Sequence, residues 1–315
     1  MRIFYTTDVH GSTVCFKKFL NSWKFYKADA IILGGDITGK MVVPMVEQDD
    51  GSYVVKHLGS THVIKSEEEL KTLEKRIEDS GYYPYRTNKK EMEEFASNKS
   101  KVDELFVKLM IERIKHWVQL AEERLKGQNV ACYVQPGNDD RYEIDPILEK
   151  SSVIINTEGK VIDVDKHHEM ISSGHANITP WKCPRDVPEE KLAEIIEGLA
   201  SKVRNMENCI FNFHCPPYDT NLDLGPDLDE NLRPKLEAGG TVKLIPVGSK
   251  AIRKAIEKYQ PLLGLHGHIH ESKASFKLGR SLLLNPGSEY GEGVLRGVIV
   301  DISKKKVESF LFVQG

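Results

Sequence analysis

"LLGLHGHIHES", residues 262–272, places three histidines within five positions directly after an apolar run. In a β-strand, side chains two positions apart lie on the same face, so His266, His268 and His270 would all point in one direction. Three imidazoles on one face do not form a hydrophobic core. The stretch therefore predicts a buried strand that ends in a polar cluster, which is either a metal site or a solvated strand edge.

The same pattern, a short apolar run followed by polar residues, occurs at four other places in the chain. Apolar runs of about four to eight residues are typical of strands that are buried on both faces. In layered α/β folds, ligands bind beyond the C-terminal ends of such strands. The polar residues that follow the four runs are Asp8 with His10, Asp36, Asn138 with Asp139 and Asp140, and His214. Together with the histidine stretch they favour a metal site over a solvated edge.

Segments with helical periodicity alternate with these strands. The predicted helices cover residues 13–26, 102–127 and 249–259. Further strands joined by turns are predicted within residues 152–164, 169–174, 273–288 and 295–313. The sum predicts an α/β fold whose core is a layered β-sandwich of two sheets flanked by helices.

Residues 41 to about 100 separate the second core strand from the long helix by far more than a usual connection. A hairpin around Asp50 and Gly51 is predicted for residues 42–58. A helix is predicted for residues 66–81, with Ser66 and Glu69 as a capping box at its start. We therefore predict one domain over residues 1–315, with an inserted cap at 41–100. Because the insertion follows Asp36, it is expected to act as a lid that covers the site. The alternative is a disordered surface excursion.

Composition limits the class of protein. The chain has 315 residues, of which 40% are hydrophobic and 29% charged, with a net charge of −3. This balance is typical of a soluble globular protein, so neither a membrane nor a nucleic acid is expected as a partner. The five cysteines form no CxxC pair and the first residues contain no signal-peptide pattern, which predicts a cytoplasmic location without disulfides.

The polar residues at the strand ends mix carboxylate and amide oxygens with imidazoles and include no thiolate. This mixture suits a pair of divalent first-row metals better than Mg²⁺ alone or a structural zinc. Asp8 and His10 are spaced to chelate one ion together, as are His268 and His270. Asp36 follows two glycines, and its two oxygens can bridge two ions. Two metals about 3.5–4 Å apart polarise a phosphoryl group and activate water at neutral pH.

The order of the motifs resembles the calcineurin-like metallophosphoesterase superfamily. The pattern D-x-H, G-D, G-N-x-D, a lone histidine and G-H-x-H stands here as Asp8-Val9-His10, Gly35-Asp36, Gly137-Asn138-Asp139-Asp140, His214 and Gly267-His268-Ile269-His270. "GHIHES" followed by "LLLNPGS" is similar to the small prokaryotic phosphodiesterase-like branch of that superfamily. The matches span residues 8–288 and leave only the insertion outside, which implies that residues 1–315 are one metallophosphoesterase domain.

The resemblance implies a role for each motif position and a reaction. Asp8, His10 and His270 would hold the first metal, Asp36 would bridge, and Asn138, His214 and His268 would hold the second. The expected activity is that of a dinuclear metal-dependent phosphohydrolase in which a metal-activated hydroxide attacks phosphorus in line. Its cofactors would be two divalent ions per chain, drawn from Mn, Fe, Ni or Zn with Mn favoured. His266 is left over and is expected to pack or to orient a neighbour.

Asp139 departs from the family pattern, in which many members have a histidine that serves the leaving group. An ordinary aspartate has a pKa of about 3.9 and would repel a phosphate dianion. This favours phosphodiesters over monoesters, unless neighbouring groups keep Asp139 protonated and let it act as an acid. Asn138, Asp139 and Asp140 are thus the predicted catalytic residues, Asp140 by orienting a neighbouring ligand.

Two alternatives to a phosphodiesterase remain open from the sequence. One is a phosphomonoesterase or nucleotidase that uses the same metals. The second is a non-catalytic scaffold of the same fold, although all seven ligand positions are filled here. In the catalytic readings the partner is a small phosphoester substrate, and the sequence says nothing about oligomeric state.

Overall fold

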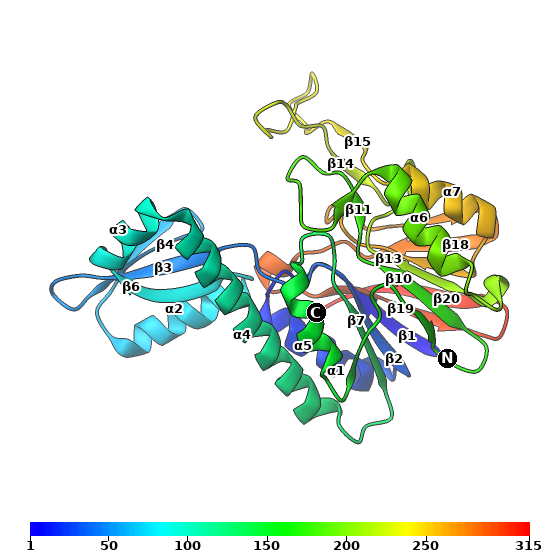
Figure 1. Cartoon of the computed structure of the whole chain (residues 1–315), viewed down its shortest axis with the longest axis horizontal. Coiled ribbons are helices and arrows are strands. Elements are labelled where there is room, and N and C mark those ends of the chain that lie inside the picture. The colour runs from blue at the N-terminus through cyan, green and yellow to red at the C-terminus, as the bar shows by residue number, and fades with distance from the viewer.

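Two six-stranded β-sheets lie face to face at the centre of the computed structural model, which describes residues 1–315 (Figure 1). The first sheet has the strand order β20-β19-β1-β2-β7-β8, and the second has the order β17-β18-β16-β13-β10-β9. The first comprises β1 (Arg2–Thr6), β2 (Ala30–Gly34), β7 (Ala131–Gln135), β8 (Ile154–Asn156), β19 (Arg296–Ile302) and β20 (Val307–Gln314). The second comprises β9 (Val161–Asp163), β10 (Glu169–Ser173), β13 (Ile210–Phe213), β16 (Leu263–Leu265), β17 (Ala274–Leu278) and β18 (Ser281–Asn285).

Each sheet contains four neighbouring strands that are parallel to one another. In the first sheet β1, β2, β7 and β8 run the same way, and in the second β10, β13, β16 and β18 do so. Antiparallel strands complete the sheets at β19, β20, β17 and β9. Because these four strands are parallel, their C-terminal ends gather at one edge of each sheet, where the polar residues follow.

Alternation along the strands builds three apolar layers. In β1, Ile3 and Tyr5 point into the core between the two sheets, whereas Phe4 points to the helices on the outer face. In β2, Ile32 and Ile31 divide in the same way. Each fully buried side chain of this size contributes about 1.5–3 kcal/mol, so both faces of the central strands stabilise the sandwich.

Helices cover the outer faces of both sheets, so the layers are α/β/β/α as predicted. The first sheet is covered by α1 (Thr13–Tyr26), α4 (Lys99–Leu125) and α5 (Asp145–Glu149), and the second by α6 (Glu189–Ala200) and α7 (Lys250–Tyr259). The sequence did not indicate α6, which follows Pro188 without a side-chain cap. None of the helices combines the length and the apolar character needed to span a bilayer.

Residues 42–97 form a separate lobe with its own small core (Figure 1). Its elements are β3 (Val42–Glu47), β4 (Tyr53–His57), β5 (Ser60–Ile64), α2 (Glu67–Asp79), β6 (Tyr83–Asn88) and α3 (Lys89–Ser97). The predicted hairpin is confirmed as the antiparallel pair β3 and β4. The predicted helix is confirmed as α2, where the Ser66 hydroxyl accepts from the Glu69 amide at 3.2 Å. The Glu69 carboxylate accepts from the Lys65 amide, one residue earlier than a capping box requires.

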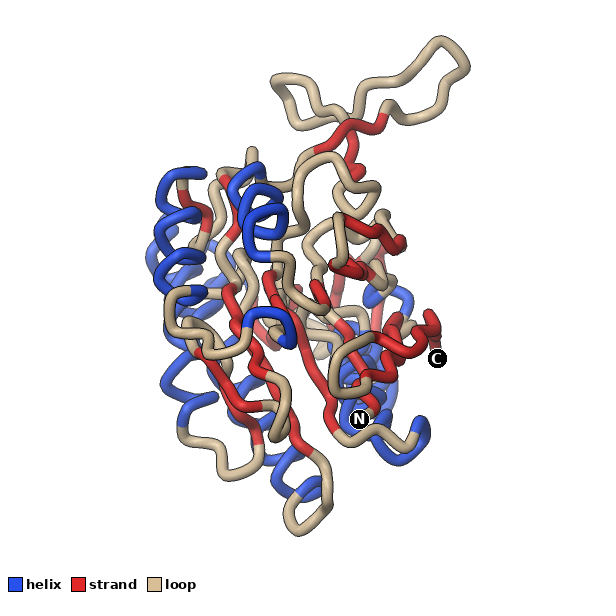
Figure 2. The backbone as a smooth tube through the Cα atoms, turned by 90° about the vertical axis from the view of Figure 1, so that its right-hand side faces the viewer, coloured by secondary structure: helices blue, strands red, loops and turns tan.

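A projecting arm forms the second departure from the sandwich. It begins at β14 (Leu224–Pro226), returns at β15 (Leu244–Pro246) and extends away from the body between them (Figure 2). The Asp227 carboxylate accepts from the ammonium groups of Lys235 and Lys243 at 2.8 and 2.9 Å, which joins its two sides. No hydrophobic periodicity in residues 227–243 indicated this arm.

The strands β8 and β9 confirm the two strands and the turn predicted within residues 152–164, but the two strands do not pair with each other. β8 pairs with β7 in the first sheet, and β9 pairs with β10 in the second. The turn at Gly159 carries the chain from one sheet to the other. Each strand is only three residues long, so the apolar pattern predicts a strand without predicting its partner.

Candidate metal centre

The loops after the central strands bring the predicted ligands together. Three groups of donor atoms form, and within each group the atoms lie within 4.8 Å of one another. The first group comes from Asp8, His10 and His270, and the second from Asp36, His214 and His268. The third, from His10, Asp36 and Asp139, shares a member with each of the other two. Asn138, the seventh predicted ligand, lines the same cleft as Asp36 and His268. The structure therefore brings residues from both sheets to one place.

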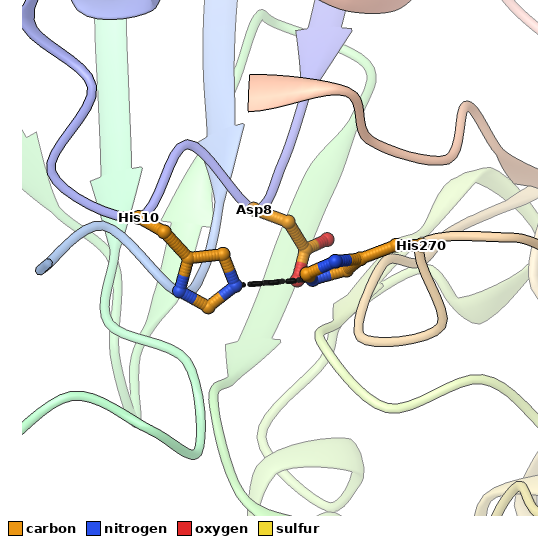
Figure 3. Close-up of side chains that lie close together, drawn as sticks. All are labelled: Asp8, His10 and His270. Carbon is orange, nitrogen blue, oxygen red and sulfur yellow. Dashed lines mark hydrogen bonds and ion pairs between the residues drawn. The ribbon is translucent and has the colours of Figure 1, made fainter. Parts of the chain in front are cut away.

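In the first group, Asp8, His10 and His270 point toward one another (Figure 3). The Nε2 atoms of His10 and His270 lie 3.0 Å apart, and His270 Nε2 lies 3.3 Å from Asp8 Oδ1. Two nitrogen ligands about 2.1 Å from one ion and at right angles to each other are about 3.0 Å apart. The spacing of the two imidazoles is therefore that of neighbouring ligands on one cation.

Asp36 lies between the first and second groups. Its Oδ2 atom is 3.5 Å from His10 Nε2 in the first group, and its Oδ1 atom is 3.3 Å from His214 Nε2 in the second. Each carboxylate oxygen thus faces a different set of donors. This is the arrangement that a bridging carboxylate needs.

Two buried ligand atoms have no hydrogen-bond partner, namely Asn138 Oδ1 and His214 Nε2. The opposite end of each side chain is fixed, because Asn138 Nδ2 donates to Asp186 Oδ1 and His214 Nδ1 donates to the Gly34 carbonyl, both at 2.9 Å. Leaving a buried polar atom unpaired costs about 1–3 kcal/mol. A cation would satisfy both atoms, so the residues present fit a metal.

Burial and nearby charged groups set the protonation states of His214 and His268. Burial alone would lower the pKa of His214, but Asp36 and Asp8 outweigh burial and raise this pKa to about 10. The second group therefore attracts a positive charge, which a metal ion would supply in place of a proton. Burial, reinforced by His214, lowers the pKa of His268 to about 4. His268 is thus neutral at pH 7, the form that binds metals.

The backbone is left-handed at four of the predicted ligands. The φ angles are +54° at Asp8, +39° at His10, +49° at Asp36 and +68° at His268. A residue other than glycine in this region costs about 1–2 kcal/mol. Such conformations persist where the surrounding structure enforces them and are concentrated at functional sites.

Two motif glycines are required because other atoms approach them closely. A Cβ atom on Gly137 would lie 2.2 Å from Asp36 Oδ1, and one on Gly267 would lie 2.5 Å from Asp8 Oδ2. No side chain fits at either distance. The glycines of the G-N and G-H motifs thus give the carboxylates the space that they occupy.

Asp140 joins the loop that carries Asp36 to the loop that carries Asn138. It is fully buried, and its carboxylate accepts from the Gly137 amide, the Ile37 amide and both the amide and hydroxyl of Thr38, at 2.6–2.9 Å. Burial and the charge of Asp36 raise its pKa to about 6, against the effect of these donors. Asp140 does not line the cleft, so its place is that of a positioning residue.

Asp139 lines the cleft beside a lysine. Its Oδ2 atom lies 3.8 Å from Lys40 Nζ and 3.9 Å from His10 Nδ1. Burial and the neighbouring Asp36 raise the pKa of Asp139. Lys40 was not predicted from the sequence, because no motif marks it and the loop after Asp36 must fold back to place it here.

Asp186 is a second residue that the sequence did not reveal. Besides holding Asn138, its Oδ2 atom accepts from the amides of Thr179 and Cys183, each at 2.9 Å. It follows Asn138 by 48 positions and has no motif of its own. By contrast, His266 packs as expected, fully buried and within 2.8 Å of the Phe213 carbonyl, apart from both ligand groups.

A cleft of about 1550 Å³ opens over the centre. Its lining includes Asp36, Asn138, Asp139, His268 and His270. Its walls come from the start of α4, from residues 177–184 and from the arm. Of the predicted insertion, only the ends line the cleft, and the lobe lies to one side (Figure 1). In this conformation the lobe flanks the cleft and does not cover it.

Comparison with known proteins bears on the fold. No known protein-family profile matches the sequence. The chain is 34% identical over 153 residues to MJ1162, an uncharacterized protein of Methanocaldococcus jannaschii. The match covers 48% of this chain and 61% of that protein, so it spans less than two thirds of the relative.

Solved structures resemble the whole chain. TT1561 of Thermus thermophilus is 14% identical with a TM-score of 0.54, covering 100% of this chain and 97% of that one. An archaeal phosphodiesterase aligns with 12% identity and a TM-score of 0.37, covering 100% and 99% of the two chains. The likeness to TT1561 is one of fold: this chain has the same overall α/β architecture, with two layered sheets between helices.

Proposed function

We propose that this chain is a dinuclear metal-dependent phosphohydrolase that prefers phosphodiesters. The observation that carries the proposal is Asp36, whose two oxygens face His10 at 3.5 Å and His214 at 3.3 Å. A carboxylate shared between two sets of donors is what a pair of cations with a common bridge requires. A single-metal site would not need the second set.

The donors divide naturally between two ions. Asp8, His10 and His270 would hold one, and Asn138, His214 and His268 would hold the second, with Asp36 shared. When bound, the two cations would polarise a phosphoryl oxygen and activate a water molecule at neutral pH. Oxygen and imidazole donors without a thiolate suit Mn, Fe, Ni or Zn, of which we favour Mn.

The chain's own residues orient the ligands and the substrate. Asp186 fixes the Asn138 amide so that its oxygen is the free atom, and Asp140 fixes the loop that carries Asp36. Lys40 presents its ammonium group to the cleft, where it would bind a phosphoryl oxygen. Water is kept from the ligands by burial, since Asp8, His10 and His214 are almost fully enclosed.

The preference for diesters rests on Asp139, whose carboxylate would repel the second charge of a monoester. A phosphomonoesterase or nucleotidase is the second candidate, and Lys40 favours it. Its ammonium lies 3.8 Å from Asp139 and offsets part of that repulsion.

Metal content and substrate choice test the proposal together. Protein purified without chelator should contain about two equivalents of transition metal per chain. Apo-protein reconstituted with Mn²⁺, Ni²⁺, Zn²⁺ or Mg²⁺ should then hydrolyse bis(p-nitrophenyl) phosphate faster than p-nitrophenyl phosphate. A metal-free, inactive protein would instead indicate a scaffold, and faster monoester turnover would support the second candidate.

A further inference from the structure

The cleft over the centre is larger than a small phosphoester needs. Pockets for small molecules usually enclose about 300–1,000 Å³, and this one encloses about 1550 Å³. Four of the seven predicted ligands line it, namely Asp36, Asn138, His268 and His270, among 32 lining residues. If the phosphate binds there, most of the space remains for another part of the substrate.

Apolar side chains from four separate segments line this remaining space. Of the fifteen exposed large hydrophobic side chains in the molecule, five line the cleft. They are Met41, Val102, Ile178, Trp181 and Leu232, each of which is 40–62% exposed. A gathering of exposed apolar groups in one hollow is typical of a binding site for an apolar ligand.

The charges along the cleft argue against a polyanion. Four basic side chains line it, at Lys40, Lys99, Arg141 and Lys182, against five acidic ones at Asp36, Asp103, Asp139, Asp227 and Glu271. Two of the basic groups are already paired, Arg141 with Asp103 and Lys40 with Asp139. A nucleic-acid strand needs a row of free cations along its phosphates. The cleft offers positive charge for about one phosphate group.

We propose that the substrate is an amphiphilic phosphodiester, with one phosphate at the floor of the cleft and a long alkyl chain along its walls. This rests on the proposed function and names its substrate class. Four of the five exposed apolar residues are aliphatic, which favours an alkyl chain over a nucleobase. The arm supplies Leu232 to the lining of this space.

Chain length tests this proposal. The Mn²⁺-loaded protein is assayed with methyl, butyl and octyl p-nitrophenyl phosphate, each below its micelle concentration. A fully buried methylene is worth about 0.8 kcal/mol, or about fourfold, so partial burial should raise kcat/KM at least about 30-fold from methyl to octyl. Ile178→Ala and Leu232→Ala should reduce this ratio. Leu311→Ala, a control on the far strand β20 at a residue that is 62% exposed, should leave it unchanged.

A binding measurement separates failure of this proposal from failure of the proposed function. Octylphosphonate cannot be hydrolysed, and Trp181 is the one tryptophan of three that lines the cleft. Adding octylphosphonate should cause a saturable blue shift of fluorescence that Trp181→Phe abolishes. Hydrolysis that does not depend on chain length, without such a shift, overturns the amphiphile and leaves the phosphodiesterase. A shift without hydrolysis of any ester supports the apolar site and overturns the activity. Preference for thymidine 5′-p-nitrophenyl phosphate over the octyl ester would overturn the alkyl chain in favour of a nucleotide.

Discussion

Asp36 is the residue on which the proposed centre depends most, because each of its two carboxylate oxygens faces a different group of donors. We predict that Asp36→Asn lowers kcat by at least about 10³, since a neutral amide cannot offset charge between two dications. Metal content should fall in the same variant. Asp49→Asn, a control at a 92% exposed side chain, should leave metal and activity unchanged. Near-normal turnover of Asp36→Asn would rule out the dinuclear assignment.

Asp139 and Lys40 are expected to control the preference between monoesters and diesters. Asp139→His should raise monoester turnover relative to diester turnover by about tenfold, equal to about 1.4 kcal/mol of transition-state binding. Lys40→Met should move the same ratio in the opposite direction, because it removes the charge that offsets Asp139. The measurement is the ratio of p-nitrophenyl phosphate to bis(p-nitrophenyl) phosphate turnover in each variant. A ratio that neither substitution changes would place both side chains away from the substrate.

Among the elements, the lobe of residues 42–97 makes direct contacts with the loops that carry His10 and Asp36. Tyr83 of β6 accepts from the Gly39 amide at 2.8 Å, and the Ser12 hydroxyl donates to the Asp79 carbonyl at 2.6 Å. Arg113 of α4 is buried and donates to the Gly11 carbonyl at 2.7 Å. Gly11 and Gly39 belong to the loops that carry His10 and Asp36. The lobe is therefore positioned as a buttress for these loops.

Substitutions in the lobe should have different effects if it supports the loops of the centre than if it acts as a lid over the cleft. Tyr83→Phe leaves the buried Gly39 amide unpaired, which costs about 1–3 kcal/mol, so Mn²⁺ affinity measured by titration should fall. Tyr85→Phe is the matched control, because its hydroxyl lies on the same strand but donates to Glu91 instead. Replacing residues 45–98 by a Gly/Ser linker should weaken metal binding further. If metal affinity is kept and only substrate range broadens, the lobe acts as a lid.

The elements also show how much of the structure could be predicted from the sequence. Buried strands that end in polar residues could be predicted because apolar runs and motif spacing are local properties of the chain. Lys40, Tyr83 and Asp186 could not, because each reaches the centre only after distant segments pack. The arm was missed for a related reason, since residues 227–243 are held by the ion pairs of Asp227 and not by an apolar stripe.

For the whole molecule, metal binding and stability should be linked. The centre joins both sheets, so cations bound there stabilise the folded state relative to the unfolded chain. At a free metal concentration 100-fold above Kd this amounts to about 2.7 kcal/mol for each of the two proposed ions, and removal of both with a chelator should lower Tm by about 8 °C. Calorimetry with and without EDTA measures the shift. In Asp36→Asn the chelator should have little effect, and an equal shift in that variant would indicate metal bound elsewhere.

The wide sequence separation of the donors has a consequence for biosynthesis. The Nε2 atoms of His10 and His270 lie 3.0 Å apart, although the two residues are 260 positions apart in the sequence. A ribosome therefore completes the first group of donors only when most of the chain has been made, and a growing polypeptide cannot assemble the pair. In the proposed centre, a metal held by His10 and His270 would be acquired only after translation has passed His270, from whatever ion the surrounding compartment then offers. That ion would thus be selected where the chain folds, at the end of its synthesis.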